Sequence, residues 1–479
     1  MSTVRKSLVL SLGQNYISVA IQFVVSVVIA RLLTPSEMGV FSVAMVIIGF
    51  AQTLRDFGVS SYVIQEKELT LDKIRAAFAL TLITAWTMAL VILMTSDFAA
   101  SFYKEPGIRS VMRILAFNFA LIPFGTIAVA YMHREMNFAH PALIRVLSNL
   151  AGGITTLVLA YRGFSYLSMA WGSVAGTVCN VILAQVWRPR HLPFLPGFKE
   201  IRPAFKFGLM SNIFMLLIDA MRGVPDRVIG RTSGMAMVGY FGRGTGLITL
   251  FEKLVMSSLW NVAMPHFAQR ARQGAALKEE FLHSSRYVTA VAWPFFINLA
   301  LLAHPVVYVL YGAQWESSVP LVQLLCIASL ITAPFLLWGS MLIAIGQLRQ
   351  NVFFLSIHTP IIIGLVYFLS PHGLAAIGIG FVIVSLLDNI MSLIQCKITV
   401  DVTMSEIARV QPGSLGVTMA SAAIPVILLA INTMMPVNLW TQLLIGGTGA
   451  LLGWVAGLFL FQHPLRKELM MVMKKVGLG

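Results

Sequence analysis

The chain has 479 residues, of which 58% are hydrophobic and only 11% are charged, whereas soluble proteins average about 25% charged residues. Its net charge is +15, but long apolar runs separate the basic residues, which excludes the basic face of a nucleic-acid-binding protein. The three cysteines lie in apolar runs without C-x-x-C spacing, so no disulfide framework or metal site is predicted. The composition predicts an all-α polytopic membrane protein.

Apolar runs long enough to cross a bilayer, which takes about 20 residues, recur along the whole chain. The first follows Arg5 and Lys6 and is too long for the h-region of a signal peptide, so we interpret it as an uncleaved span. Fourteen runs are predicted, and twelve or thirteen spans stay possible because the seventh and eighth runs carry charges. The runs cover residues 8–30, 38–63, 75–95, 109–132, 143–161, 167–187, 207–231, 237–262, 287–310, 318–345, 351–369, 375–396, 414–433 and 441–462.

Lys and Arg are unequally distributed between the two sides of the predicted membrane. With the N-terminus inside, the inner segments hold 23 basic residues and the outer segments hold six. Basic loops stay in the cytoplasm, so both termini are predicted to be cytoplasmic. The loops are too short for a catalytic domain, and the chain contains no G-x-x-x-x-G-K-[ST], H-E-x-x-H or G-x-S-x-G motif. An enzyme is therefore the poorer interpretation.

The two halves of the chain repeat each other in part. The segment LYGAQWESSVPLVQLLCIASLITAP (310–334) resembles FYKEPGIRSVMRILAFNFALIP (102–123). Because six spans separate the halves, the repeats run in the same direction and a binding site is expected at their interface. We predict an N-lobe of six spans over residues 1–197, a C-lobe of six spans over 198–400, and an extra helix pair with a basic tail over 401–479. A shift of 200 residues aligns Ile29, Arg31, Gly39 and Phe41 with Ile229, Arg231, Gly239 and Phe241.

Charged residues inside the predicted spans are the first candidates for function, because an ionised group in hydrocarbon usually faces a cavity or a partner. In the second span, Gln52, Asp56 and Ser60 form a polar stripe with Arg55 beside it. The further candidates are Asp219, Arg222 and Asp226 on one face of the seventh span, Arg243 and Lys253 in the eighth, and Asp388 in the twelfth.

Two alternatives compete with a binding role for these charges. They could pair with one another as structural links between helices, or they could lie at span ends and face water. The lone histidines His133, His304 and His358 are more typical of packing or interfacial positions than of proton relay or metal ligation.

Five stretches resemble a known family. In these stretches the chain resembles the polysaccharide transporter family, which comprises Wzx-like oligosaccharide and lipopolysaccharide flippases. This family is part of the multidrug/oligosaccharidyl-lipid/polysaccharide exporter superfamily. The resemblance implies two six-helix lobes around a V-shaped cavity and alternating access. The stretches are ARLLTPSEMGVFSVA (30–44), LRDFGVSSYVIQ (54–65), FYKEPGIRSVMRILA (102–116), PDRVIGRTSGMAMVGYFGRG (225–244) and LYGAQWESSVPLVQLL (310–325).

The resemblance also implies a substrate and a location. Undecaprenyl-pyrophosphate-linked oligosaccharide units of an exopolysaccharide, capsule or O-antigen would be flipped across a bacterial inner membrane. Membrane lipid, a polysaccharide polymerase and a chain-length regulator would be partners. No cofactor is implied, and the coupling ion, H⁺ or Na⁺, stays open. Family members place arginines of their first two helices in the cavity, and Arg31 and Arg55 match by position, with Arg31 at the outer end of its span.

The residues themselves agree with an anionic substrate. Arginine binds a pyrophosphate bidentately and keeps its proton. The alternative is a cation-coupled multidrug antiporter on the same fold, in which Asp56, Asp219 or Asp388 would bind the coupling ion. Arg31, Arg243 and Lys253 add positive charge and favour the lipid-linked glycan.

The distribution of basic residues generates a topological prediction. Periplasm-active reporters fused at either terminus, or near residues 195 and 275, should be silent, because all four places are predicted to be cytoplasmic. Reporter activity near residue 275 alone would show that the seventh or eighth span is wrongly placed.

Overall fold

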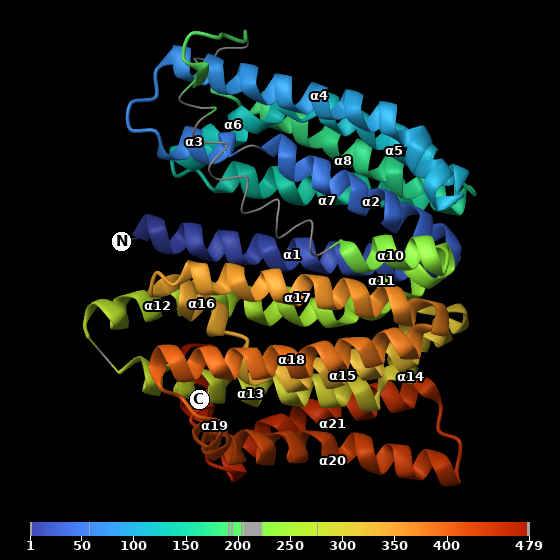
Figure 1. Ribbon diagram of the computed structural model, residues 1–479, viewed down its shortest axis with the longest axis vertical. Helices are drawn as coiled ribbons and strands as arrows, with labels where there is room; N and C mark the ends of the chain where they lie inside the picture. Colours follow the sequence, from blue (N-terminus) through green and yellow to red (C-terminus); the bar gives the residue numbers. More distant parts are fainter. Residues whose placement is uncertain are drawn as a thin grey trace. The chain divides into compact units, whose positions relative to one another are not determined.

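The structure, a computed structural model, describes residues 2–56, 58–189, 192, 195–202, 205, 223–274 and 276–476. Every regular element in these ranges is a helix (Figure 1), which confirms the predicted all-α class. The chain divides into two compact units, residues 1–239 and 240–479, and the division falls within one helix.

In the described residues, the first unit contains helices α1 to α8, α10 and the start of α11. Several helix starts follow from local sequence: Thr70 accepts a hydrogen bond from the Lys73 amide at the start of α4, and Glu105 caps α5 just before Pro106. The bounds are α1 Ser2–Leu32, α2 Pro35–Asp56, α3 Val59–Gln65, α4 Leu71–Tyr103, α5 Pro106–Leu121, α6 Pro123–Arg134, α7 Ala139–Tyr161, α8 Leu167–Val186, α10 Val224–Thr232 and α11 Met235–Phe251.

The second unit contains the rest of α11 and the helices that follow it. A π-helical turn, η1, interrupts the run from α11 to α12. A capping box of Thr403 and Glu406 begins α19. The bounds are η1 Glu252–Met256, α12 Ser257–Arg272, α13 Leu277–Leu301, α14 Ala303–Tyr311, η2 Ala313–Ser318, α15 Val319–Thr332, η3 Ala333–Phe335, α16 Trp338–Ala344, α17 Leu348–Leu369, η4 Ser370–His372, α18 Leu374–Val400, α19 Met404–Val410, α20 Pro412–Met434, α21 Leu439–Leu460 and α22 Leu465–Val476.

Nine helices in the described part of the chain are long and apolar enough to cross a membrane, or eleven if each of two bent helix pairs is one span. All eleven coincide with predicted spans, so the chain is a multi-pass membrane protein. Of the three other predicted spans, 207–231 lies mostly outside the described residues. The run 237–262 falls in α11, η1 and the start of α12, and 351–369 falls in α17.

Three of the predicted spans are not straight. The ninth bends by 74° between α13 and α14. The fourth bends by 50° between α5 and α6, where Pro123 begins α6. The second is interrupted, because Gly58 has a left-handed φ of 62° between the end of α2 and the start of α3. The expected stripe of Gln52, Asp56 and Ser60 assumed one continuous helix, and this prediction was wrong.

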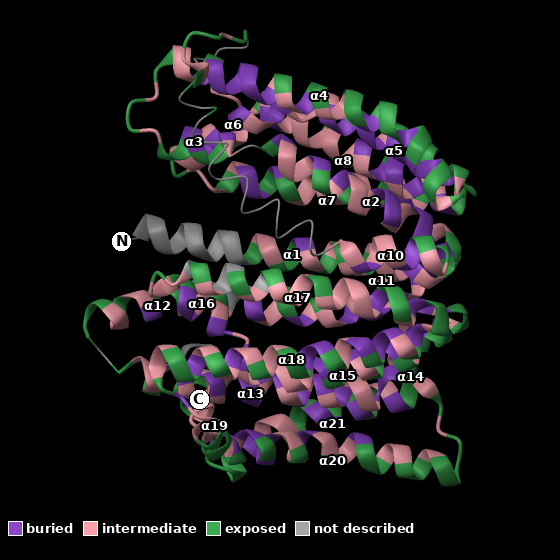
Figure 2. Cartoon of the chain, in the orientation of Figure 1, coloured by how far each residue is buried: buried purple, intermediate pink, exposed green. Residues whose placement is uncertain are grey.

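The surface of α4 shows how the protein meets lipid. Trp86, Leu90, Met94 and Phe98 follow one another at four-residue steps, and all four are exposed. Figure 2 shows exposed positions along this helix, while Ile74, Ala77, Ile92 and other residues of α4 are buried. An exposed apolar stripe of this kind suits hydrocarbon rather than water.

Small residues bring neighbouring helices into close contact, as predicted for the glycines of the sixth and last spans. A Cβ at Gly172 of α8 would overlap Thr156 and the Gly152 carbonyl oxygen of α7. A Cβ at Gly453 of α21 would overlap the carbonyl oxygen of Ala420 on α20. The glycines therefore serve helix packing, and the prediction is confirmed.

A reciprocal contact joins two glycines that the 200-residue shift aligns. A Cβ at Gly39, near the start of α2, would overlap the carbonyl oxygen of Met235, the first residue of α11. A Cβ at Gly239 would overlap the carbonyl oxygen of Pro35, the first residue of α2. The two helix starts thus approach each other backbone to backbone, and the residue pairs in contact obey the same shift as the sequence repeat.

This contact predicts a stability difference within one helix. Gly39→Ala should destabilise the purified protein, since overpacking costs about 1–3 kcal/mol and the obstacle is a backbone oxygen. Gly49→Ala, also in α2, meets nothing within 4 Å and should leave the melting temperature in detergent unchanged or slightly raised. Equal melting temperatures for the two variants would show that the glycine contact is absent.

Candidate functional site

Arg55 is a buried cation at the end of a membrane helix. It lies in the last turn of α2, where a positive charge is favourable beside the helix carbonyl end. The residue is only 8% exposed. Its guanidinium carbon lies 5.4 Å from the ring centroid of Phe119 on α5, a cation–π distance. The charged residue predicted inside the second span is therefore buried in the structure.

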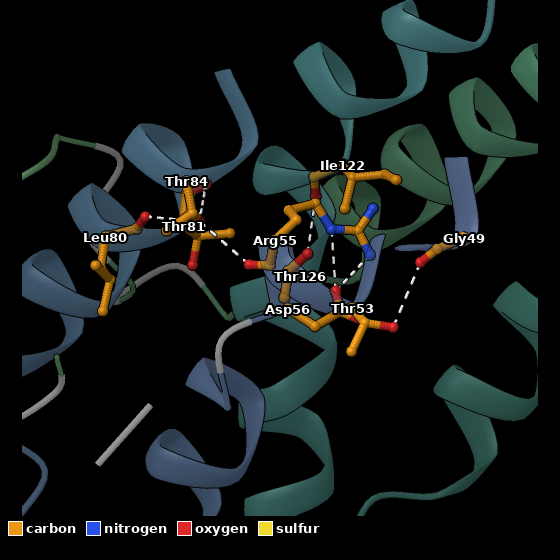
Figure 3. A network of polar contacts seen from close by, with 9 residues as sticks. All are labelled: Gly49, Thr53, Arg55, Asp56, Leu80, Thr81, Thr84, Ile122 and Thr126. Carbon is orange, nitrogen blue, oxygen red and sulfur yellow. Dashed lines mark hydrogen bonds and ion pairs between the residues drawn. The ribbon is translucent and has the colours of Figure 1, made fainter. Parts of the chain in front are cut away.

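Asp56 is the carboxylate partner of Arg55. Arg55 Nε donates to Asp56 Oδ1 at 3.0 Å, and Nη2 forms an ion pair with the same oxygen (Figure 3). The Asp56 side chain is 66% exposed, whereas that of Arg55 is 10% exposed. Nη1 of Arg55 is buried without a hydrogen-bond partner among the described residues. A buried donor without an acceptor is costly, so the guanidinium retains capacity for a further anionic oxygen.

A hydroxyl group fixes the backbone that presents Arg55. Thr84 Oγ1 on α4 lies within donor distance of the Arg55 carbonyl oxygen, at 3.2 Å, and of the Leu80 carbonyl oxygen, at 2.9 Å. Figure 3 shows Thr84 beside the end of α2. The last turn of α2 leaves carbonyls without helical partners, and this contact satisfies one of them while tying α2 to α4.

The short helix α10 places two further charged residues, Asp226 and Arg227, beside α2. Asp226 is partly buried in its first turn, where a negative charge is favourable. Arg227 Nη2 donates to the Val46 carbonyl oxygen at 3.5 Å. Val46 and Arg55 are nine residues apart in α2, about 14 Å along the axis at 1.5 Å per residue, so this pair is separate from Arg55.

The arginines aligned by the repeat occupy equivalent positions. Arg31 is exposed in the last turn of α1, and Arg231 lies in the last turn of α10 with its guanidinium carbon 5.2 Å from the Phe102 ring centroid. The favourable charge–dipole interaction at a helix C-terminus accounts for both places. Arg31 therefore lies at the end of its span, as expected from the sequence.

In the second unit, Arg243 contacts aromatic rings. Its guanidinium carbon lies 5.4 Å from the Tyr311 ring centroid and 5.6 Å from that of Trp315. Aromatic faces stabilise a cation without neutralising it. Lys253, in contrast, is exposed on the π-helical turn η1. π-helical turns inside longer helices often accompany functional positions.

Asp388 has a partner that sequence reasoning did not assign to it. His358 Nε2 on α17 lies 3.2 Å from Asp388 Oδ2 on α18. The His358 ring stacks at 10° on Phe354, with 5.9 Å between centroids. The sequence did not show this partner of His358, because thirty residues separate the two side chains and only helix packing brings them together.

The structure thus places the predicted residues in several separate groups. Arg55 and Asp56 lie together, and Asp226 has Arg227 as its neighbour in α10. Asp219 and Arg222 lie outside the described residues. In the part of the chain that the structure describes, no group of three or more His, Cys, Asp and Glu residues could hold a metal ion. The contact of Phe119 with Arg55 and the pairing of His358 with Asp388 were missed, because both join residues that are far apart in the sequence.

Comparison with solved structures identifies the fold. The inward closed conformation of the lipid II flippase MurJ superposes with a TM-score of 0.76 at 11% identity, covering 97% of this chain and 100% of that one. An inward-facing multidrug resistance MATE family transporter gives a TM-score of 0.61 at 13% identity, covering 82% of this chain and 96% of the other. Both similarities concern the fold alone.

Sequence relatives are more specific. The lipopolysaccharide biosynthesis protein WzxC of Escherichia coli K12 is 23% identical over 76% of this chain and 75% of its own length. The succinoglycan biosynthesis transport protein ExoT of Rhizobium meliloti is 24% identical over 68% of this chain and 66% of its own length. A sequence model of the polysaccharide biosynthesis protein family matches residues 28–320. With more than half of its length matched, the chain belongs to the polysaccharide biosynthesis protein family.

Proposed function

We propose that this protein is a flippase that translocates lipid-linked oligosaccharide units, carried on undecaprenyl pyrophosphate, across the bacterial inner membrane. The names of WzxC and ExoT connect its relatives with lipopolysaccharide and succinoglycan biosynthesis, and ExoT is a transport protein. The chain is accordingly a transporter and not an enzyme. Its product would be used in making an exopolysaccharide, a capsule or an O-antigen, with a polymerase and a chain-length regulator as partners.

The buried guanidinium of Arg55 carries the proposal. A pyrophosphate leaving water needs charge-assisted hydrogen bonds, and arginine supplies them in a planar fork without losing its proton. Arg55 already holds one carboxylate, that of Asp56, whose side chain is largely exposed. We infer that the head group displaces Asp56 from Arg55 and supplies the acceptor that Nη1 lacks. Asp56 would then return as the substrate leaves, which avoids an unpaired buried charge between cycles.

The other candidate residues have supporting roles in the proposal. Arg31, Arg243 and Lys253 would raise the positive potential along the substrate path, together with Arg222. Asp219 and Asp226 would accept hydrogen bonds from sugar hydroxyls. Asp388, whose Oδ2 lies 3.2 Å from His358 Nε2, would do the same.

The proposed membrane arrangement follows the sequence. Fourteen spans form an N-lobe over residues 1–197, a C-lobe over 198–400 and an added helix pair with a basic tail over 401–479. The reciprocal glycine contact supports the repeat from which the lobes were deduced. Alternating access between two lobes, with both termini in the cytoplasm, would move the head group while the lipid tail stays in the bilayer.

A cation-coupled multidrug antiporter is the competing function. It would need carboxylates available to an organic cation. Among the described candidates, Asp56 is paired with Arg55 and Asp388 with His358. This pairing favours an anionic substrate.

Replacement of Arg55 tests the anion site. Arg55→Ala should lower export of the polysaccharide at least about tenfold, since a charge-assisted hydrogen bond is worth about 1.5–3 kcal/mol. Arg55→Lys should restore export only in part, because lysine brings the charge without the fork. Export is measured as surface polysaccharide per amount of protein in the membrane.

A matched control removes an arginine that lies on the surface of the same unit. Arg113 forms an exposed ion pair with Asp97 at 3.0 Å, and exposed pairs contribute little. Arg113→Ala should therefore export normally. If Arg55→Ala also exports normally at normal abundance, Arg55 does not bind the head group.

Deletion of the gene tests the substrate class. Surface or secreted polysaccharide should be depleted, and its lipid-linked repeat units should accumulate on the cytoplasmic face of the membrane. Extraction and mass spectrometry of the lipid-linked units measure this accumulation. If the deletion strain makes unchanged amounts of polysaccharide and is more sensitive to cationic dyes, the protein is an antiporter and the flippase proposal is wrong.

A further inference from the structure

A cavity of about 500 Å³ lies in the first unit, and none of the charged residues described above lines it. Its walls come from α1, α7 and α8, with Ile122 from the junction of α5 and α6. Cavities that hold small organic ligands measure about 300–1,000 Å³. The volume therefore suits a ligand much larger than a few water molecules.

The lining of this cavity is polar but uncharged. Of its fourteen lining residues, seven carry amide or hydroxyl side chains, four are glycines and none is charged. Amides and hydroxyls both donate and accept hydrogen bonds, which suits sugar hydroxyls. An ionic group would find no counter-charge in the lining. The seven polar residues are Gln22, Ser148, Asn149, Thr156, Ser173, Thr177 and Asn180.

Several of these groups have unused hydrogen-bonding capacity. The Ser148 residue is only 8% exposed, and its Oγ is buried without a partner among the described residues. Within the same ranges, the side-chain amides of Asn149 and Asn180 form no hydrogen bond to protein. Buried polar groups are normally satisfied by protein, water or a ligand. The cavity thus gathers donors and acceptors that a bound ligand would satisfy.

Close helix packing gives the cavity a fixed frame. Gly172 and Gly176 of α8 approach the carbonyl oxygens of Gly152 and Ser148 on α7, so no side chain can be added there without displacing backbone. Thr156 Oγ1 donates to the Gly152 carbonyl oxygen at 2.8 Å. A preformed frame reduces the entropy lost on binding.

Helix α5 connects the cavity to the anion site. Asn118 Nδ2 donates to Ser173 Oγ in the cavity wall at 3.0 Å. The next residue, Phe119, stacks against the Arg55 guanidinium. Adjacent residues of α5 therefore contact the wall of the uncharged cavity and the buried cation.

We propose that the cavity between α1, α7 and α8 binds an uncharged sugar residue of the transported glycan. This inference rests on the proposed function, because it takes the sugar from the lipid-linked unit. Arg55 would hold the pyrophosphate, and the amides of Asn149 and Asn180 would bind hydroxyls of the sugar. The cavity would then distinguish glycosylated lipid from bare lipid carrier.

Native mass spectrometry of the purified full-length protein tests the proposal with two probes. One is undecaprenyl pyrophosphate without sugar, and the other is the lipid-linked repeat unit extracted from the source strain. Asn149→Ala and Asn180→Ala should each weaken binding of the glycosylated lipid about five- to tenfold, as expected for one lost hydrogen bond. Both should bind the sugar-free lipid as the unaltered protein does, which also shows that they are folded.

A further variant of the cavity and a matched control outside it separate the possible outcomes. Thr177→Val, which alters the cavity, should weaken binding of the glycosylated lipid, whereas Thr155→Val, on α7 but outside the lining, should not. Arg55→Ala should weaken both lipids, and if it weakens neither, the anion site of the proposed function fails. If the asparagine variants bind both lipids normally or lose both equally, the sugar site fails and the cavity holds only water. If those variants lose only added free monosaccharides, the cavity binds free sugar and the proposal is overturned.

Discussion

The cost of holding a guanidinium among membrane helices is the constraint on which the first unit is built. Arg55 meets this cost with the Asp56 carboxylate, the face of Phe119 and a place at the carbonyl end of α2. Thr84 holds the same turn through the Arg55 carbonyl oxygen. These contacts come from three helices, yet they leave Nη1 without an acceptor. We propose that this remaining donor binds an anionic oxygen of the substrate.

Close backbone approach is the second organising feature, because apolar side chains gain nothing by leaving lipid for one another. Glycine contacts join α7 to α8 and α20 to α21, and Gly39 and Gly239 join the starts of α2 and α11. At α7 and α8 the same close packing frames a cavity with uncharged polar walls. The same small residues therefore pack the helices and frame the cavity in which we propose that a sugar binds.

Charged groups have local partners in the described parts of both units. Asp388 has His358, Arg243 has the faces of Tyr311 and Trp315, and Arg227 has a carbonyl oxygen of α2. Such partners lower the free-energy cost of burying each charged group. A substrate that carries both a pyrophosphate and sugars suits this arrangement, since Arg55 offers charge and the cavity offers only dipoles.

The sequence by itself determined the membrane class, eleven of the predicted spans, the helix-packing glycines and the family, because hydropathy, glycine spacing and family patterns are local properties of the chain. It also placed Arg55 and Asp388 inside spans. Only the tertiary structure decided their partners: Phe119 is 64 residues from Arg55, and His358 is 30 from Asp388. The sequence also did not show the helix break at Gly58 or the cavity. Uncharged Asn149 and Asn180 resemble ordinary span residues until α1, α7 and α8 pack together and leave a space between them.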